Sequence, residues 1–275
     1  MSYSFLVTSN TKVLLIGIDG LMIHRAISSG RAQTLASLKS DSYFAEMRVD
    51  LPTVSGPSWS TILTGTTQHV HKVVDNDFKD HNLKQTPDFL SQAKSLNPEL
   101  ITYAAAGWPP LIDPTDIGPV IATRSEDQES GSHIIFHRDG ETRGYETVDH
   151  EVAEDALKTL TEIGPDVSFV YFCGADEAGH MHGTLKGHYF DAIERIDALV
   201  TRLYQVIKKR HQELSENWLI VITTDHGHRD EGGHGGESEQ ERASFVIAHA
   251  IGAPHPSWPP TINPDDLVGQ ILATL

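Results

Sequence analysis

Cysteine and basic residues are scarce in this chain. Only one cysteine, Cys173, is present among 275 residues, which excludes an intramolecular disulfide framework. Because Cys173 lies in an apolar run, we expect a buried small side chain and not a nucleophile. The 21 Lys and Arg are outnumbered by 38 Asp and Glu, which gives a formal net charge of −17. This charge argues against nucleic-acid polymers and anionic membranes as partners, because long-range repulsion slows their approach.

Long apolar runs are lacking as well. The run at residues 13–18 is too short to span a bilayer, and residues 1–12 show no basic segment followed by an apolar core. We therefore expect no secretory signal and a cytoplasmic location. A hydrophobic content of 39% with 21% charged residues is typical of a folded soluble protein. The length favours a single domain over residues 1–275.

Short apolar runs alternate with amphipathic stretches along the chain. Strands are predicted at residues 12–19, 43–51, 100–106, 167–173, 218–223 and 243–248. Helices are predicted at residues 34–40, 57–63, 86–95, 149–163, 185–212 and 264–273. This alternation predicts an α/β fold with a mostly parallel central sheet and helices on both faces.

Residues 107–145 interrupt the alternation. The segment is rich in Pro, Gly, Asp and Ser, and its one apolar run covers only residues 134–136. We interpret it as an ordered loop or small hairpin inserted near the active site, with a disordered insert as the alternative. Long loops in compact domains are usually functional, so this one is a candidate for substrate selection. Trp108 follows a strand end and is either a wall of the pocket or purely structural.

Carboxylates and imidazoles gather just after three of the predicted strands. The residues are Asp19 after the first strand, Asp176 and His180 after the fourth, and Asp225, His226 and His234 after the fifth. Ligands bind at the carboxyl ends of parallel strands, and these side chains suit a divalent metal. Six ligands divide into two sites of three, each open to water or substrate, as a catalytic metal requires. Two such metals can hold the attacking and leaving oxygens of a phosphoryl or sulfuryl transfer. The alternative is a polar surface loop, since the chain holds 16 histidines.

Ser55 stands just before Pro57, which suits the first turn of a helix. Its hydroxyl would lie in the positive field of the helix N-terminus, where anions are attracted. Taken alone, Ser55 is best interpreted as an N-cap. A metal nearby would make it a nucleophile, because an unassisted serine is a poor one.

Together these motifs resemble the alkaline phosphatase superfamily. They are Ile-Asp-Gly at 18–20, Pro-Thr-Val-Ser-Gly-Pro-Ser at 52–58, Leu-Thr-Gly at 63–65, Asp-Glu-Ala-Gly-His-Met-His-Gly at 176–183, Asp-His-Gly at 225–227 and His-Gly at 234–235. The order is most similar to the nucleotide pyrophosphatase/phosphodiesterase branch, with phosphonoacetate hydrolases as near relatives.

The resemblance implies a two-metal site. Implied ligands of one metal, usually zinc with manganese as an alternative, are Asp19, Asp225, His226 and the nucleophile Ser55. Implied ligands of the second metal are Asp176, His180 and His234. Asn76 matches the Asn that contacts a phosphoryl oxygen in the phosphodiesterase branch.

The activity implied is hydrolysis of a small anionic phosphoester, most simply a phosphodiester, through a covalent phosphoserine. Alternatives are a phosphomonoesterase, a phosphonoacetate-type hydrolase and a catalytically silent metal- and phosphate-binding protein. Trp59 stands where the sulfatase motif needs Arg, which argues against a sulfatase. Only seven residues separate His226 from His234, which implies a compact core without a large cap.

Four neighbouring residues are given less specific roles. We expect His182 and His228 to lie behind the ligands or on the surface, and Asp230 and Glu231 to form a solvated loop face. We also expect protons to displace metal from the histidine ligands below about pH 6, before the carboxylates titrate.

Overall fold

The computed structural model describes residues 11–185 and 187–275. Residues 1–10, in which we expect no secretory signal, and residue 186, inside the predicted helix 185–212, lie outside the described residues. The strands are β1 (Lys12–Ile18), β2 (Tyr43–Arg48), β3 (Thr102–Ala106), β4 (His133–His137), β5 (Val167–Phe172), β6 (Trp218–Thr223) and β7 (Ala243–Ile251). The helices are α1 (Ile23–Ser28), α2 (Gln33–Ser40), α3 (Ser55–Thr64), α4 (Gln68–His71), η1 (Leu83–Gln85), α5 (Phe89–Leu96), α6 (Pro109–Ile112), α7 (Ser125–Glu129), α8 (Gly140–Arg143), α9 (Tyr145–Glu162), α10 (Gly174–His182), α11 (Gly187–Leu214), α12 (Glu239–Arg242), η2 (Pro264–Asp266) and α13 (Leu267–Leu272).

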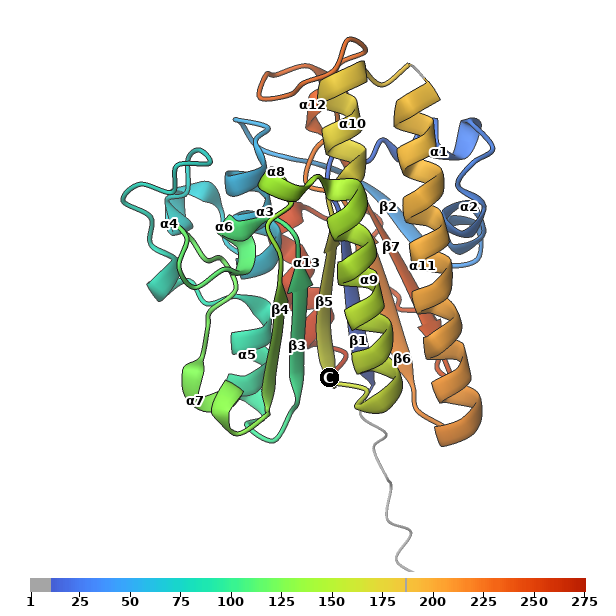
Figure 1. The fold of residues 1–275 in the computed structure, drawn as a ribbon. Coiled ribbons are helices and arrows are strands. Elements are labelled where there is room, and N and C mark those ends of the chain that lie inside the picture. The colour runs from blue at the N-terminus through green and yellow to red at the C-terminus, as the bar shows by residue number, and fades with distance from the viewer. Residues whose placement is uncertain (1–10, 186) are drawn as a thin grey trace, which may run out of the picture.

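The described strands form one sheet in the order β2-β7-β6-β1-β5-β3-β4 (Figure 1). From β6 to β4 all neighbours are parallel. Strand β7 runs antiparallel to both β6 and β2. The mostly parallel α/β sheet predicted from the sequence is confirmed.

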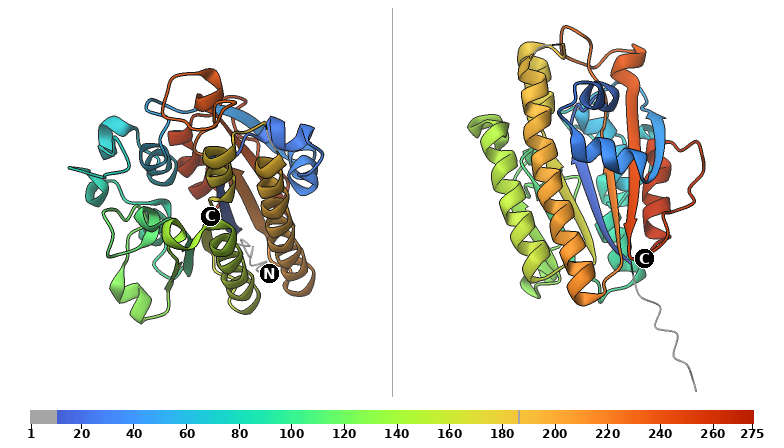
Figure 2. Two further views of the ribbon diagram at one scale, coloured as in Figure 1. Left: turned by 45° about the horizontal axis from the view of Figure 1, so that its top comes forward. Right: turned by 90° about the vertical axis from the view of Figure 1, so that its right-hand side faces the viewer.

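Helices cover both faces of the sheet, as the side view in Figure 2 shows. Strand β1 demonstrates why, because its alternate residues enter two different cores. Val13 and Leu15 pack with residues of α3, α5 and α13, whereas Leu14 and Ile16 pack with residues of α2, α9 and α11. A strand buried on both faces must be apolar throughout, which accounts for the unbroken apolar run.

The hairpin interpretation of residues 107–145 is wrong. Strand β4 pairs parallel with β3, from Thr102 opposite His133 to Ala106 opposite His137, and so extends the central sheet at its edge. The remainder of the segment carries the short helices α6, α7 and α8. An edge strand is covered less completely than a central one, so a three-residue apolar run suffices and the sequence signal is weak.

Helix α10 is absent from the helices predicted above. It carries Asp176 and His180 four residues apart, which places both on one face of the helix. Gly174 and Gly179 lower its helix propensity, so the sequence there does not look helical. Within the described part of the chain, no helix has the length and apolar content needed to cross a bilayer.

Candidate active site and metal centre

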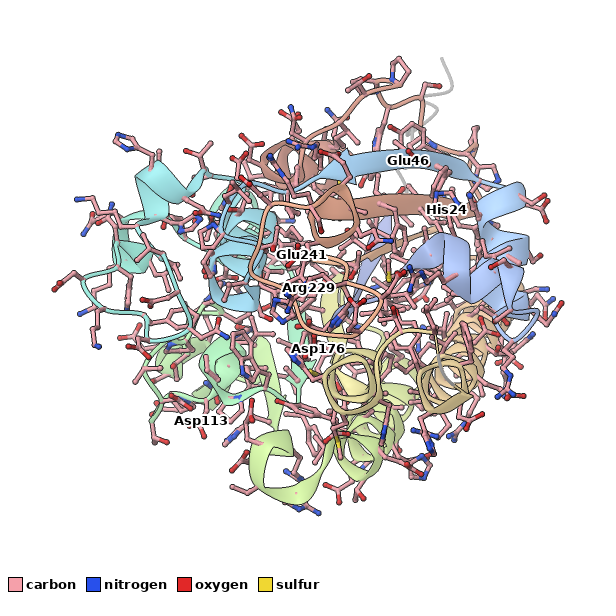
Figure 3. The ribbon with its side chains drawn as sticks, turned by 90° about the horizontal axis from the view of Figure 1, so that it is seen from above. His24, Glu46, Asp113, Asp176, Arg229 and Glu241 are labelled. Atoms are coloured by element: carbon pink, nitrogen blue, oxygen red, sulfur yellow. The ribbon has the colours of Figure 1, made fainter. Side chains whose placement is uncertain are left out.

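A cavity of about 300 Å³ opens at the carboxyl ends of the parallel strands. Its lining includes seven residues predicted from the sequence: Asp19, Ser55, Asn76, Trp108, Asp176, His180 and His234. Asp225 and His226 are fully buried beside them. Viewed onto the strand ends, Asp176 on α10 lies near the centre of the molecule (Figure 3). The structure therefore brings all the predicted site residues together.

Three of the predicted ligands, Asp19, Asp225 and His226, form what we call the buried cluster. His226 Nε2 lies 3.1 Å from Asp225 Oδ2 and 3.6 Å from Asp19 Oδ1. Ser55 Oγ lies 3.2 Å from the same nitrogen. Because the ligand atoms of Asp19, Asp225 and His226 all lie within 4.8 Å of one another, they can share one metal ion.

Hydrogen bonds outside the buried cluster aim its ligand atoms inward. Asp19 Oδ2 accepts from Trp59 Nε1 at 2.8 Å and from the Tyr171 hydroxyl at 2.6 Å. Asp225 Oδ1 accepts from the Gly20 amide at 3.3 Å. The other carboxylate oxygens, Asp19 Oδ1 and Asp225 Oδ2, accept no hydrogen bond from any described residue although both are buried. A buried carboxylate oxygen without a hydrogen-bond partner is costly, and coordination to a cation would offset that cost.

The other three predicted ligands, Asp176, His180 and His234, form the open cluster. The Nε2 atoms of His180 and His234 lie 2.9 Å apart, each 3.5 Å from Asp176 Oδ1. His234 Nδ1 is 2.6 Å from the carbonyl oxygen of Thr53, so Nδ1 carries the proton and donates it there. In the neutral ring, Nε2 then has a free lone pair that can coordinate a metal. Two imidazole nitrogens and a carboxylate oxygen facing one point make a second candidate site for a divalent cation.

Burial changes the protonation of both clusters. It raises the pKa of Asp19 to about 7, with the charge of Asp176 adding to the rise, and it also raises that of Asp176 to about 7. Burial likewise raises the pKa of Asp225 well above its ordinary value. By contrast, burial lowers the pKa of His234 to about 4 and that of His226 well below its ordinary value. In the metal-free protein, desolvation therefore disfavours every charged form. The displacement of bound metal by protons below about pH 6 stays a prediction.

His228 is not at the surface. Its side chain is fully buried, and Nε2 lies 2.9 Å from Asp176 Oδ1. The ring fits into a gap left by two glycines, since a Cβ atom on Gly20 or Gly179 would come within 2.5 Å or 2.9 Å of it. With Asp176 and His226, His228 forms a third set of converging ligand atoms. His228 is therefore a further candidate metal ligand, a role that the sequence did not indicate.

The other loop residues have modest roles. His182 is half-buried, and its ring centroid lies 4.3 Å from that of His188. Asp230 forms an ion pair with Arg25, and Glu231 is exposed, so the solvated face predicted here includes one ion pair.

Ser55 is the first residue of α3, not a residue ahead of the helix. The next amide, that of Gly56, donates to Asn76 Oδ1 at 2.7 Å. With its oxygen engaged in this way, the Asn76 amide has its NH₂ group left to donate to a ligand in the cavity. A Cβ atom on Gly56 would lie 2.8 Å from Asn76 Oδ1, so only glycine allows this contact.

The comparisons with known proteins agree with this geometry. Residues 13–237 match the model of the type I phosphodiesterase/nucleotide pyrophosphatase family. The chain belongs to this family. The resemblance to the alkaline phosphatase superfamily is confirmed, and the family is one of phosphoester-processing enzymes.

Individual relatives differ in how much of them the chain covers. The catalytic subunit of human GPI ethanolamine phosphate transferase 3 is 30% identical over 129 residues, which are 47% of this chain and 11% of that protein. The chain spans less than a third of the length of the curated relatives it matches.

Two solved structures show the shared fold. Murine ectonucleotide pyrophosphatase/phosphodiesterase 5, as an inactive variant in complex with AMP, aligns with a TM-score of 0.68 at 14% identity, over 96% of this chain and 94% of that one. Phosphonoacetate hydrolase from Sinorhizobium meliloti aligns with a TM-score of 0.59 at 16% identity, over 80% of this chain and 57% of that one.

Proposed function

We propose that this chain is a metal-dependent phosphodiester hydrolase in which Ser55 is the nucleophile. The observation that carries the proposal is the position of the Ser55 hydroxyl. It lines the cavity shared with Asp19 and Asp176, and it lies 3.2 Å from His226 Nε2 in the buried cluster. A hydroxyl amid converging ligand atoms is the arrangement that activates an otherwise weak nucleophile.

The residues present fit two divalent cations, with zinc as the first choice and manganese as the second. Their ligands would be those of the buried cluster with Ser55 and those of the open cluster. Bound there, the cations would supply positive charge that favours loss of the Ser55 proton and offsets the phosphoryl charge. One oxygen of each carboxylate supports this assignment, because it is buried and has no hydrogen-bond partner among the described residues: Asp19 Oδ1, Asp176 Oδ1 and Asp225 Oδ2.

The remaining steps are assigned to the chain itself. Ser55 Oγ forms a bond to phosphorus as the bond from phosphorus to the first alcohol breaks, and the Ser55 proton leaves with that alcohol. The Asn76 amide donates to a non-bridging oxygen throughout. Water then cleaves the phosphoserine, which restores the serine hydroxyl and releases a phosphomonoester.

A diester is favoured over a monoester by the charge of the cavity. None of its lining residues in the described chain is Lys or Arg. Arg229 points toward Glu241, with Nε 3.8 Å from Oε1. A monoester carries a second negative charge that no basic side chain here would offset.

Transfer to an alcohol in place of water is the second candidate. It is favoured by the match to the GPI ethanolamine phosphate transferases, whose names describe phosphoryl transfer. The small anionic substrate, the exclusion of nucleic acid and membranes as partners, and the cytoplasmic location stay predictions.

The test is nitrophenolate release from bis(p-nitrophenyl) phosphate by the metal-loaded protein. We expect Ser55→Ala to lower kcat by at least about a thousandfold with bound metal unchanged. Ser60→Ala is the matched control, because Ser60 is buried in the same helix and lies outside the cavity lining. Near-normal turnover by Ser55→Ala would contradict the covalent route.

Two further measurements separate the alternatives. No turnover with two metals bound would favour the silent binding protein, and activity that survives prolonged chelation would contradict metal dependence. An added alcohol that increases nitrophenolate release and appears in a new diester would favour the transferase.

A further inference from the structure

His234, a ligand of the open cluster, lies in a stretch of chain with little conformational restraint of its own. The loop between β6 and α12 has an irregular backbone, and in it two glycines precede the histidine and two follow it. Gly235 has a φ of +108°, a backbone conformation that other residues rarely adopt. A ligand in such a loop needs support from elsewhere in the fold if its nitrogen is to stay in one position.

Thr53 supplies that support through three hydrogen bonds. Its carbonyl oxygen accepts from His234 Nδ1 at 2.6 Å. Its hydroxyl accepts from the Gly235 amide and donates to the Gly236 carbonyl oxygen, each at 2.9 Å. Thr53 is 0% exposed, so within the protein its hydroxyl serves as donor and acceptor at once. One buried residue therefore binds three consecutive residues of the loop.

Thr53 also belongs to the segment that carries the proposed nucleophile. It precedes Ser55 by two residues, in the connection from β2 to α3. Ser55 Oγ lies 3.2 Å from His226 Nε2 of the buried cluster. The same short segment therefore reaches both clusters, with Ser55 beside the buried one and Thr53 beside a ligand of the open one.

The role of Thr53 differs from that of the other residues around the loop. Thr53 is not among the described residues that line the cavity, so it is not placed to touch a substrate there. Glu241 Oε1 accepts from the Gly236 amide at 2.9 Å and so binds the loop two residues beyond the histidine. Thr53, by contrast, binds the imidazole itself as well as the two residues that follow it.

We propose that Thr53 is a positioning residue, which holds the His234 imidazole in place for metal binding and ties it to the segment that carries Ser55. Held in this way, His234 Nε2 lies 3.5 Å from Asp176 Oδ1. A ligand that is already in position loses less conformational entropy when it binds. Loss of the Thr53 hydroxyl should therefore weaken metal binding at the open cluster. This inference rests on the proposed metal centre.

The test measures zinc affinity in two variants of Thr53. Thr53→Val removes the hydroxyl with little change of shape, and we expect the second zinc ion to bind about tenfold less tightly. Thr53→Ser keeps the hydroxyl and should retain the affinity to within about threefold. Zinc is titrated against a competing chelator, so the readout does not depend on turnover. Excess zinc should then restore most of the turnover of Thr53→Val with bis(p-nitrophenyl) phosphate.

Thr102→Val is the matched control. Thr102 is also 0% exposed, its hydroxyl lies 2.8 Å from His133 Nδ1, and it is outside the cavity lining. We expect this variant to lose a similar amount of thermal stability and to keep the zinc affinity of the wild type. An equal loss of zinc from Thr102→Val would show a general effect of removing a buried hydroxyl and would overturn the assignment to His234.

Amide hydrogen exchange in the zinc-loaded protein reports on the Thr53 hydroxyl directly. In the wild type we expect the Gly235 amide to exchange slowly, because it donates to that hydroxyl. Thr53→Val should speed its exchange by about tenfold or more. The Gly236 amide, which donates to Glu241, should change less. Fast exchange at Gly235 in the wild type would overturn the inference even if Thr53→Val does not fold.

The outcomes separate this inference from the proposed function. If the wild type binds two zinc ions, unchanged affinity in Thr53→Val or an equal loss in Thr53→Ser would overturn the role of the hydroxyl and leave the metal centre intact. Turnover of Thr53→Val that stays low with both sites filled would place the effect at Ser55 and overturn the assignment to His234. A wild type that binds neither zinc nor manganese would overturn the metal centre, and this inference with it.

Discussion

The buried and open clusters use the same kinds of ligand in opposite surroundings. The side chains of Asp225 and His226 are 0% exposed, whereas that of His180 is 47% exposed. The buried cluster follows strands β1 and β6, and the open cluster comes from α10 and a glycine-rich loop. If both clusters hold metal as proposed, they divide the work: the buried cluster lies beside Ser55, the proposed nucleophile, and the open cluster faces entering ligands.

Rigidity and access have different energetic consequences. Carboxylates removed from water without a cation are unstable as anions, so the buried cluster should hold metal tightly or else protonate. A half-exposed imidazole keeps contact with water and loses less when the metal leaves. Metal should therefore dissociate first from the open cluster.

Replacing one ligand in each cluster tests this difference most strongly. Asp225→Ala should lower kcat/KM by on the order of a thousandfold, because it removes charge beside Ser55 that excess metal cannot restore. His180→Ala should weaken metal binding by roughly ten- to a hundredfold and regain most activity in excess zinc. Metal titration with turnover at each concentration provides the measurement.

His182→Ala is the control, since His182 lies on α10 two residues beyond His180. It should leave metal binding unchanged. Equal rescue of Asp225→Ala and His180→Ala by zinc would show that the two clusters do not differ as proposed.

A Trp59 variant tests whether hydrogen bonds from residues around the buried cluster strengthen its binding of metal. Trp59→Phe removes the indole that donates to Asp19 Oδ2 at 2.8 Å, and we expect metal affinity to fall by about tenfold. Trp218→Phe is a matched control, because Trp218 is also fully buried and its indole donates to Glu216 at 3.0 Å. Both variants should lose similar thermal stability, and only Trp59→Phe should lose metal. Equal metal affinity in the two variants would contradict the role of the indole.

The sequence predicted most of the sheet and the candidate ligands that converge at its edge because each depends on local patterns. Buried strands require apolar runs, and the ligands follow those strands directly. The hydrogen bond from Trp59 to Asp19 joins residues 40 positions apart in the sequence. In the sequence, Trp59 indicated only that the chain lacks the arginine of the sulfatase motif. Gly17 allows that link, since a Cβ atom there would lie 2.5 Å from the Trp59 ring.

The other features that the sequence did not predict were missed for similar reasons. Strand β4 has too short an apolar run, and α10 contains two glycines. Glu141 and Glu177 are two of 38 acidic residues, and nothing in the sequence sets them apart until the fold places them in one cavity. Sequence patterns therefore indicate candidate ligands better than they indicate the residues that line the rest of the cavity.

The smallest expected effect concerns pH and the metal-free protein. Burial raises the pKa of Asp19 and Asp176 to about 7, above the unfolded value of ~3.9. The folded state then binds more protons than the unfolded chain, so the free energy of unfolding falls as pH rises from about 4 through 7. A bound divalent cation favours the ionised carboxylates and should remove this loss.

Buried histidines act in the opposite direction over part of this range. Burial lowers the pKa of His228 and His234 to about 4, so their contribution to stability rises between about pH 4 and 6.5 and is constant above. From pH 6.5 to 8 only the carboxyl groups still change, and Tm of the chelated protein should fall by about a few degrees. Burial also raises the pKa of Asp149 to about 7. Because Asp149 is not a proposed metal ligand, its titration should lower Tm of the metal-loaded protein as well, by the smaller amount that remains. Parallel thermal melts with chelator and with zinc measure the difference. A chelated protein that is no more sensitive to pH than the loaded one would show that neither cluster titrates as its burial requires.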